Sequence, residues 1–148
     1  MPHFGLIDEN ALGPVEGPFM RAKLHIRGGR RRLNQGKISL GIITLYDAVI
    51  SAMQWYIADP SHEKMVNFGD NEDRNDDRTV YRVLTRSGVL DGKFDYDMFN
   101  ELAERALAEE MPAYDHRDVL KGVEAVMTQL GIMPFDEKDL PPEDPETV

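Results

Sequence analysis

The sequence predicts an all-α fold, a single-domain bundle of about five helices. Apolar residues recur at helical spacing in five segments, and glycine or proline stands near most of their ends. No segment shows a convincing run of the alternating pattern that is typical of strands. A chain of 148 residues can bury a core as one domain. We expect an extended arm over residues 1–17, a helical bundle over 18–133, and an acidic, proline-rich tail over 134–148 that is extended or disordered.

The first two predicted helices form a hairpin over residues 18–58. Pro18 suits the first position of a helix that runs to about Gln35, and Gly36 suits the turn that follows it. The pair Gly28-Gly29 lies inside this helix, where each glycine costs about 1 kcal/mol relative to alanine. We therefore expect a kink there or a close contact with another helix.

The second helix of the hairpin, about 37–57, should lie at the centre of the bundle. Apolar side chains cover most of its circumference, so other helices must surround it. A charged residue in mid-helix is costly in lipid, and we expect a buried helix of a soluble bundle with no membrane contact. Asp59-Pro60 should end the helix. The exceptions to its apolar character form a narrow seam: Thr44, Asp47, Ser51 and Gln54.

Three shorter helices complete the prediction. A polar loop over 59–73 should lead to the third, about 74–87. Asp95 and Asp115 should act as N-caps of the fourth and fifth, each with an apolar pair placed to form a hydrophobic staple. Gly131 should end the fifth helix.

The composition limits the classes of function. The chain has no cysteine, which excludes disulfides, thiolate metal sites and cysteine nucleophiles. A cytoplasmic location is the natural expectation, and the first ten residues lack the pattern of a signal peptide. Residues 1–57 hold seven Lys and Arg against four Asp and Glu, and residues 58–148 hold ten against 23. This acidic excess disfavours general affinity for nucleic acid or anionic membranes.

Basic residues nevertheless crowd the first helix, and such a cluster can bind phosphate. Pairing with acidic helices of the same chain, or with an acidic partner, is the interpretation we favour. The candidate contacts for nucleic acid or for an acidic partner are Arg21, His25, Arg27, Arg30, Arg31 and Arg32.

The hairpin also carries a resemblance. With Leu33-Asn34-Gln35-Gly36-Lys37 at its turn and Thr44-Leu45-Tyr46-Asp47-Ala48 beyond, it resembles HEPN domains and the repeat hairpins of TPR proteins over about 40 residues. Many HEPN proteins are ribonucleases in which His follows Arg after four to six residues. Only three residues separate Arg21 from His25, a departure that counts against this activity. A TPR array would need tandem copies, and the sequence has none.

No catalytic, metal or cofactor site is predicted. No Glu has a His three residues later, as bundle di-iron sites require, and the acidic run over 70–77 lacks the pattern of an EF-hand. Gly28-Gly29 does not stand between a strand and a helix, and no serine has the surroundings of a nucleophile elbow. The polar seam suggests one possible small-ligand pocket, around Asp47, Trp55 and Tyr56.

The favoured hypothesis is a non-enzymatic cytoplasmic module that binds other proteins, including a second copy of itself as a homodimer. The chain ends contain apolar residues or prolines, and arms of this kind often cross a dimer interface. The first alternative is an RNA-associated, HEPN-like protein that uses the basic first helix. It requires Arg21, His25 and residues 30–32 to share one exposed face. The second alternative is small-ligand binding inside the bundle.

Overall fold

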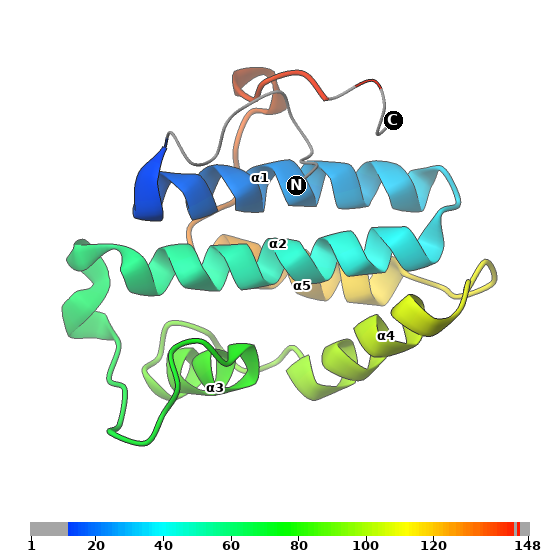
Figure 1. Ribbon diagram of the computed structural model, residues 1–148. Helices are drawn as coiled ribbons and strands as arrows, with labels where there is room; N and C mark the ends of the chain where they lie inside the picture. Colours follow the sequence, from blue (N-terminus) through cyan, green and yellow to red (C-terminus); the bar gives the residue numbers. More distant parts are fainter. Residues whose placement is uncertain (1–11, 144, 146–148) are drawn as a thin grey trace.

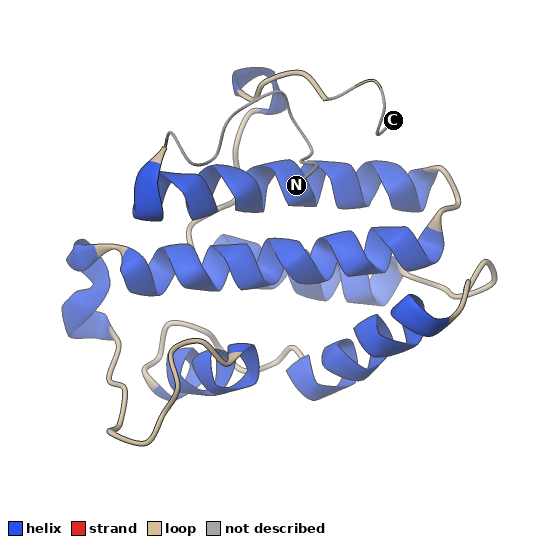
Figure 2. Cartoon of the chain, in the orientation of Figure 1, coloured by secondary structure: helices blue, strands red, loops and turns tan. Residues whose placement is uncertain are grey.

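A computed structural model describes residues 12–143 and 145, and every regular element in this part of the chain is helical (Figures 1 and 2). The predicted all-α bundle is confirmed. The described residues form five α-helices, one short 3-10 helix between α2 and α3, and another after α5. In chain order they are α1 Gly13–Asn34, α2 Ile38–Ala58, η2 Pro60–Met65, α3 Asp77–Arg86, α4 Tyr96–Ala108, α5 Arg117–Gln129 and η3 Glu137–Asp139.

The α1–α2 hairpin turns at Gly36. This glycine has a φ of +78°, a left-handed conformation that costs glycine little. The amide of Lys37 donates to the carbonyl of Arg32 at 2.9 Å, and the amide of Gly36 donates to that of Leu33 at 3.1 Å. These two bonds form a Schellman motif, which satisfies the last carbonyls of α1. The turn predicted from the sequence is therefore confirmed.

Two glycines bring α1 and α2 close together. A Cβ atom at Gly29 would stand 2.7 Å from Cδ2 of Leu45, and one at Gly41 would stand 2.7 Å from Cδ2 of Leu33. Each helix thus presents a leucine to a glycine of the other helix. The close helix contact expected at Gly28-Gly29 is found at Gly29.

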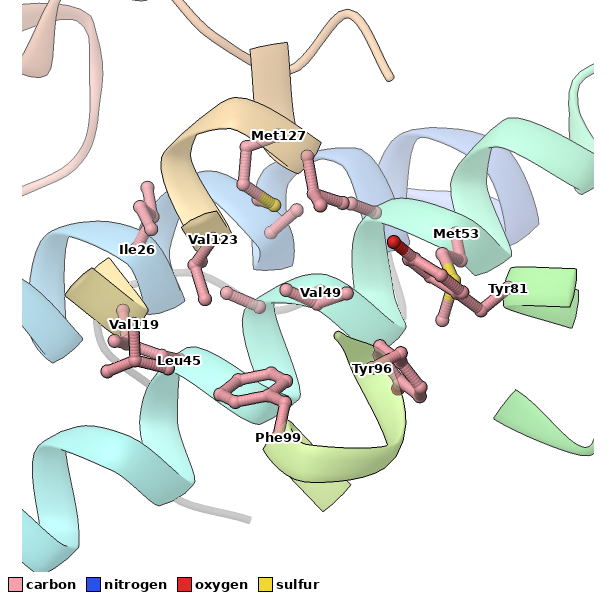
Figure 3. Packing of buried hydrophobic residues seen from close by; sticks show 14 of the residues in the cluster. Ile26, Leu45, Val49, Met53, Tyr81, Tyr96, Phe99, Val119, Val123 and Met127 are labelled. Carbon is pink, nitrogen blue, oxygen red and sulfur yellow. The ribbon is translucent and has the colours of Figure 1, made fainter. Parts of the chain in front are cut away.

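Helix α2 is the central element, as its apolar circumference predicted. It contacts α1, α3, α4, α5 and η2. Figure 3 shows Val49 and Leu45 of α2 surrounded by side chains that include Ile26 of α1, Phe99 of α4 and Val123 of α5. By length and composition, α2 is the one helix among the described residues that could cross a membrane, yet more than half of its most apolar stretch is buried inside the protein.

Helices α4 and α5 follow the predicted end signals with one correction. Asp95 caps α4 by accepting from the amide of Met98 at 3.0 Å, and Gly131, with a φ of +88°, follows α5. The prediction that Asp115 is the N-cap of α5 is wrong, because His116 occupies that position. Asp115 instead accepts from the amide and the guanidinium of Arg117, which holds the loop just before the helix.

The start of α1 also differs from the prediction. The helix begins at Gly13, so the prediction of an extended arm is wrong for residues 13–17. Residues 1–11 of the predicted arm lie outside the described part of the chain. Pro14 occupies one of the first two positions, where its missing amide is not needed, and Pro18 lies inside the helix. The next residue, Phe19, packs against α2, where its ring lies 4.8 Å from that of Trp55.

The C-terminal tail is attached to the bundle rather than extended away from it. In Figure 1 its red segment runs along the side of α1 opposite to α2. Leu140 is buried, and Phe135 lies against the core. Apolar side chains among the prolines therefore anchor a segment that composition alone predicted to be extended or disordered.

The predicted 59–73 loop contains the short helix η2, which Asp59 caps by accepting from the amide of Ser61.

Candidate functional site

His25, the histidine of the predicted basic site, is buried between α1 and α2. Only 2 % of its surface is exposed. Its Nδ1 donates to the carbonyl oxygen of Arg21 at 2.9 Å, and its Nε2 lies 3.9 Å from Oδ2 of Asp47. A carbonyl oxygen can only accept, so this bond places the proton on Nδ1. The imidazole is thereby held within the helical hairpin, away from solvent.

The arginines of α1 make contacts within the protein. Arg30 donates to Glu124 of α5 through Nε at 3.0 Å. Arg31 Nε bridges both carboxylate oxygens of Glu143 in the tail, at 3.0 and 3.1 Å. Arg27 donates to the carbonyl of Pro141 at 2.8 Å. The basic face of α1 is therefore paired with acidic and carbonyl groups of the same chain.

Arg32 points in a different direction from these residues. It is 6 % exposed, and its Nη1 donates to Oγ1 of Thr44 at 2.9 Å. Burial lowers the pKa of its guanidinium. Arg21, His25 and residues 30–32 thus do not share the single exposed face that the RNA alternative requires.

The residues of the second predicted site, Asp47, Trp55 and Tyr56, all lie on α2. Asp47 lies beside His25, and partial burial raises the pKa of its carboxyl while the charge of Arg21 opposes the rise. Trp55 contacts Phe19, and the ring of Tyr56 stacks on that of His62 at 3.8 Å. These three residues therefore serve separate contacts along α2.

A hollow lies between α3 and the start of α4. We call it the α3–α4 groove; it has a volume of about 820 Å³ and is open to solvent. Arg78, Arg82 and Arg86 follow one face of α3 at intervals of four residues. Lys93 comes from the turn before α4, and the buried rings of Tyr81 and Tyr96 form the floor.

The cations of the α3–α4 groove differ in how closely they are paired with carboxylates. Arg78 donates to Asp97 at 2.7 Å, and Arg86 donates to Glu72 at 2.7 and 2.9 Å. Arg82 is more exposed, with 65 % of its side chain accessible, and lies 3.9 Å from the same Glu72. Arg82 and the exposed Lys93 are thus the cations of the groove best placed for a ligand.

The carboxylates of the groove are already occupied by donors. Asp76 accepts from the amide and the hydroxyl of Thr79, which lowers its pKa. Asp95 caps α4, and Asp97 pairs with Arg78. The lining therefore sets four cations, Arg78, Arg82, Arg86 and Lys93, against three aspartates whose acceptor atoms are already in use.

A hydrogen-bond network fixes the floor of the groove. Asp77, in the first turn of α3, accepts from the hydroxyls of Tyr46 and Tyr96. The amide of Asn100 donates to the Tyr46 hydroxyl at 2.6 Å. Helices α2, α3 and α4 are linked through this network. The ring of Tyr81 then stacks on that of Tyr96 with centroids 4.6 Å apart.

The tyrosines of this region are held in the neutral form at physiological pH. Burial raises the pKa of Tyr81 to about 12, with the nearby charges of Asp91 and Asp95 adding to the effect. Burial also raises the pKa of Tyr46 and of Tyr96. With neutral tyrosines at its floor and Arg82 and Lys93 exposed beside them, the arrangement is suited to binding an anionic group.

Sequence reasoning missed this groove. The spacing of Arg78, Arg82 and Arg86 was available in the sequence as a basic helix face, but the groove needs Lys93 and Tyr96 from the next elements.

Among the described residues, no group of three or more histidine and carboxylate side chains is arranged to hold a metal ion. No family model, curated protein or solved structure matches the chain.

Proposed function

We propose that the protein is a binding module that takes an acidic segment of another protein into the α3–α4 groove. The observation that carries this proposal is the pairing of a rigid aromatic floor with two accessible cations, Arg82 and Lys93. A guanidinium can hold a carboxylate through two hydrogen bonds, and an ammonium adds a second point of contact.

The shape of the groove favours a polypeptide segment. Successive side chains of an extended chain alternate in direction, so acidic side chains at every second position face the same way. Such a segment can present carboxylates to Arg82 and Lys93 while its other side chains face solvent. Polar and charged contacts of this kind favour specific association over high affinity.

Nucleic acid fits the same groove less well. A phosphate backbone carries closely spaced negative charges. Asp76, Asp95 and Asp97 also line the groove, and they oppose this dense charge more strongly than they oppose carboxylates separated by uncharged side chains. Arg27, Arg30 and Arg31 of α1 are engaged with residues of α5 and the tail, which weakens the support for the HEPN-like alternative.

The test is a fluorescence-polarisation titration of the whole chain with labelled probes. The probes are a peptide of alternating glutamate and serine, a peptide of alternating lysine and serine, and a single-stranded RNA. We expect the acidic peptide to bind most tightly. The double variant Arg82→Ala/Lys93→Ala should weaken this binding by about tenfold or more, because charge-assisted contacts are lost.

The matched control is Lys37→Ala/Lys64→Ala, which removes two exposed cations outside the groove and should bind as the wild type does. Equal binding of the acidic peptide to wild type and to Arg82→Ala/Lys93→Ala would refute the proposal. Tighter binding of RNA that is lost in the same variant would assign the groove to nucleic acid instead.

Three expectations from the sequence stay predictions. They are self-association as a homodimer, a cytoplasmic location and small-ligand binding around Asp47, Trp55 and Tyr56. Size-exclusion chromatography with light scattering tests the first: a species that stays monomeric on concentration contradicts it.

A further inference from the structure

A second hollow adjoins the α3–α4 groove on the side of α5. We call it the α4–α5 hollow; its volume is about 500 Å³, and it too is open to solvent. Apolar side chains make up much of its lining, and Met98 is among the large apolar side chains left exposed. They come from the turn before α4, from α4, from the α4–α5 loop and from α5: Phe94, Met98, Tyr114, Val119 and Ala125.

Phe94 separates the two hollows and belongs to both. Its carbonyl accepts from the Tyr81 hydroxyl at 2.8 Å on the side of the α3–α4 groove. Its ring occupies the space where a side chain of Gly122 would lie on α5. Lys93 and Asp95, its neighbours in the chain, line both hollows as well. A ligand that crosses Phe94 would therefore touch both hollows without a break.

The charge of the α4–α5 hollow is opposite to that of the first groove. Asp91, Asp95 and Asp118 line it against the single cation Lys93. Asp91 and Asp95 accept from backbone amides. An apolar lining with an acidic rim is complementary to an apolar side chain flanked by lysine or arginine.

We infer that the α4–α5 hollow is a second subsite for the same partner segment, and that it takes an apolar anchor flanked by basic residues. This inference rests on the proposed function of the α3–α4 groove. The partner segment is then bipolar: an acidic stretch lies along α3, the chain crosses Phe94, and an apolar and basic stretch lies against α4 and α5.

The reversal of charge across Phe94 gives the segment one direction of binding. A peptide with the two stretches in the opposite spatial arrangement would place glutamates beside Asp118 and lysines beside Arg82. Like charges brought together in this way oppose binding and exclude the wrong orientation.

The test compares three peptides on the full chain by isothermal titration calorimetry. The first is the acidic stretch alone, the second extends it by a leucine flanked by lysines, and the third replaces these lysines with glutamates. We expect the second to bind about tenfold more tightly than the first, and the third to lose this gain.

Two variants and a control assign the gain to the hollow. Asp118→Lys should abolish the advantage of the extended peptide, and the milder Asp118→Asn should reduce it with less effect on the first turn of α5. Glu104→Lys makes the same charge reversal at an exposed site of α4 outside the hollow and should keep the advantage.

The outcomes separate the two proposals. Binding of the acidic stretch with no gain from the extension overturns the second subsite and leaves the first groove standing. A gain that persists in Asp118→Lys and Asp118→Asn also overturns it. No binding of the acidic stretch refutes the proposed function itself, and with it the bipolar segment.

Discussion

Gly29 of α1 faces Leu45 of α2 so closely that a Cβ atom on the glycine would stand 2.7 Å from Cδ2 of the leucine. Leu45 is fully buried and cannot move outward without disturbing the core. Gly29→Ala should therefore destabilise the protein by about 1–3 kcal/mol, despite the better helix propensity of alanine. Urea unfolding followed by circular dichroism measures the change.

A double-mutant cycle with Leu45→Ala tests the cause of this loss. Truncating the leucine removes the atoms that the new methyl group meets, so the double variant should be more stable than the sum of the two single losses allows. Strictly additive losses would show that the helix contact is not what excludes a side chain at Gly29.

The buried Arg32–Thr44 hydrogen bond should contribute measurably to stability. Thr44→Val keeps the shape of the side chain but removes the hydroxyl that accepts from Arg32 and donates to the carbonyl of Leu40. We expect a loss of about 1–3 kcal/mol in the free energy of unfolding. Thr44→Ser keeps the hydroxyl and should lose less; a valine variant as stable as wild type would contradict the prediction.

The tail should come away from α1 when its ion pair is reversed. Glu143→Lys places a cation beside Arg31, whose Nε now contacts both oxygens of Glu143. Hydrogen exchange should then speed up at the amides of Asp139 and Leu140, which bond within η3. Glu110→Lys, an equal change at an exposed site elsewhere, is the control. Equal exchange in both variants would show that the pair does not hold the tail.

Glu72 should make stability depend on acid. Its hydrogen bonds from Arg86, and then from the amide of Gly69, lower its pKa from 4.5 to about 2. A lowered pKa in the folded state means that the ionised carboxylate stabilises the fold above pH 4.5. This contribution is lost as the pH falls from 4.5 towards about 2.

Urea unfolding across this pH range compares wild type with Glu72→Gln. The advantage of the wild type should shrink as the pH falls, because the variant has no carboxyl to protonate. Arg86→Gln removes the main cause of the lowered pKa and should reduce the same difference. A constant advantage at every pH would contradict the assignment to Glu72.

Local signals in the sequence were sufficient for most of the helix framework. Gly36, Asp95 and Gly131 each act through neighbouring backbone groups, so their roles could be predicted from the residues alone. The start of α1 was missed because Pro18 is also a good first residue of a helix. The helix instead begins at Gly13, with Pro14 in one of its first two positions.

The candidate site could not be predicted because it is assembled from distant elements. Lys93 and Arg82 line one groove because Tyr81 stacks on Tyr96 and Asp77 joins α3 to α2. For the basic residues of α1, the sequence pattern suggested more available positive charge than the folded protein has. Their sequence pattern suits phosphate binding, but acidic residues such as Glu124 and Glu143, far along the chain, contact them.

An NMR titration of the isotopically labelled full chain with the glutamate–serine peptide tests directly whether the α3–α4 groove binds an acidic segment. Binding in the α3–α4 groove predicts saturable shifts of the amide signals of Tyr81, Arg82, Lys93 and Tyr96. The amide signals of residues 21–32 on α1 should stay in place. Shifts confined to α1, or no saturable shifts in α3 and α4, would contradict the account.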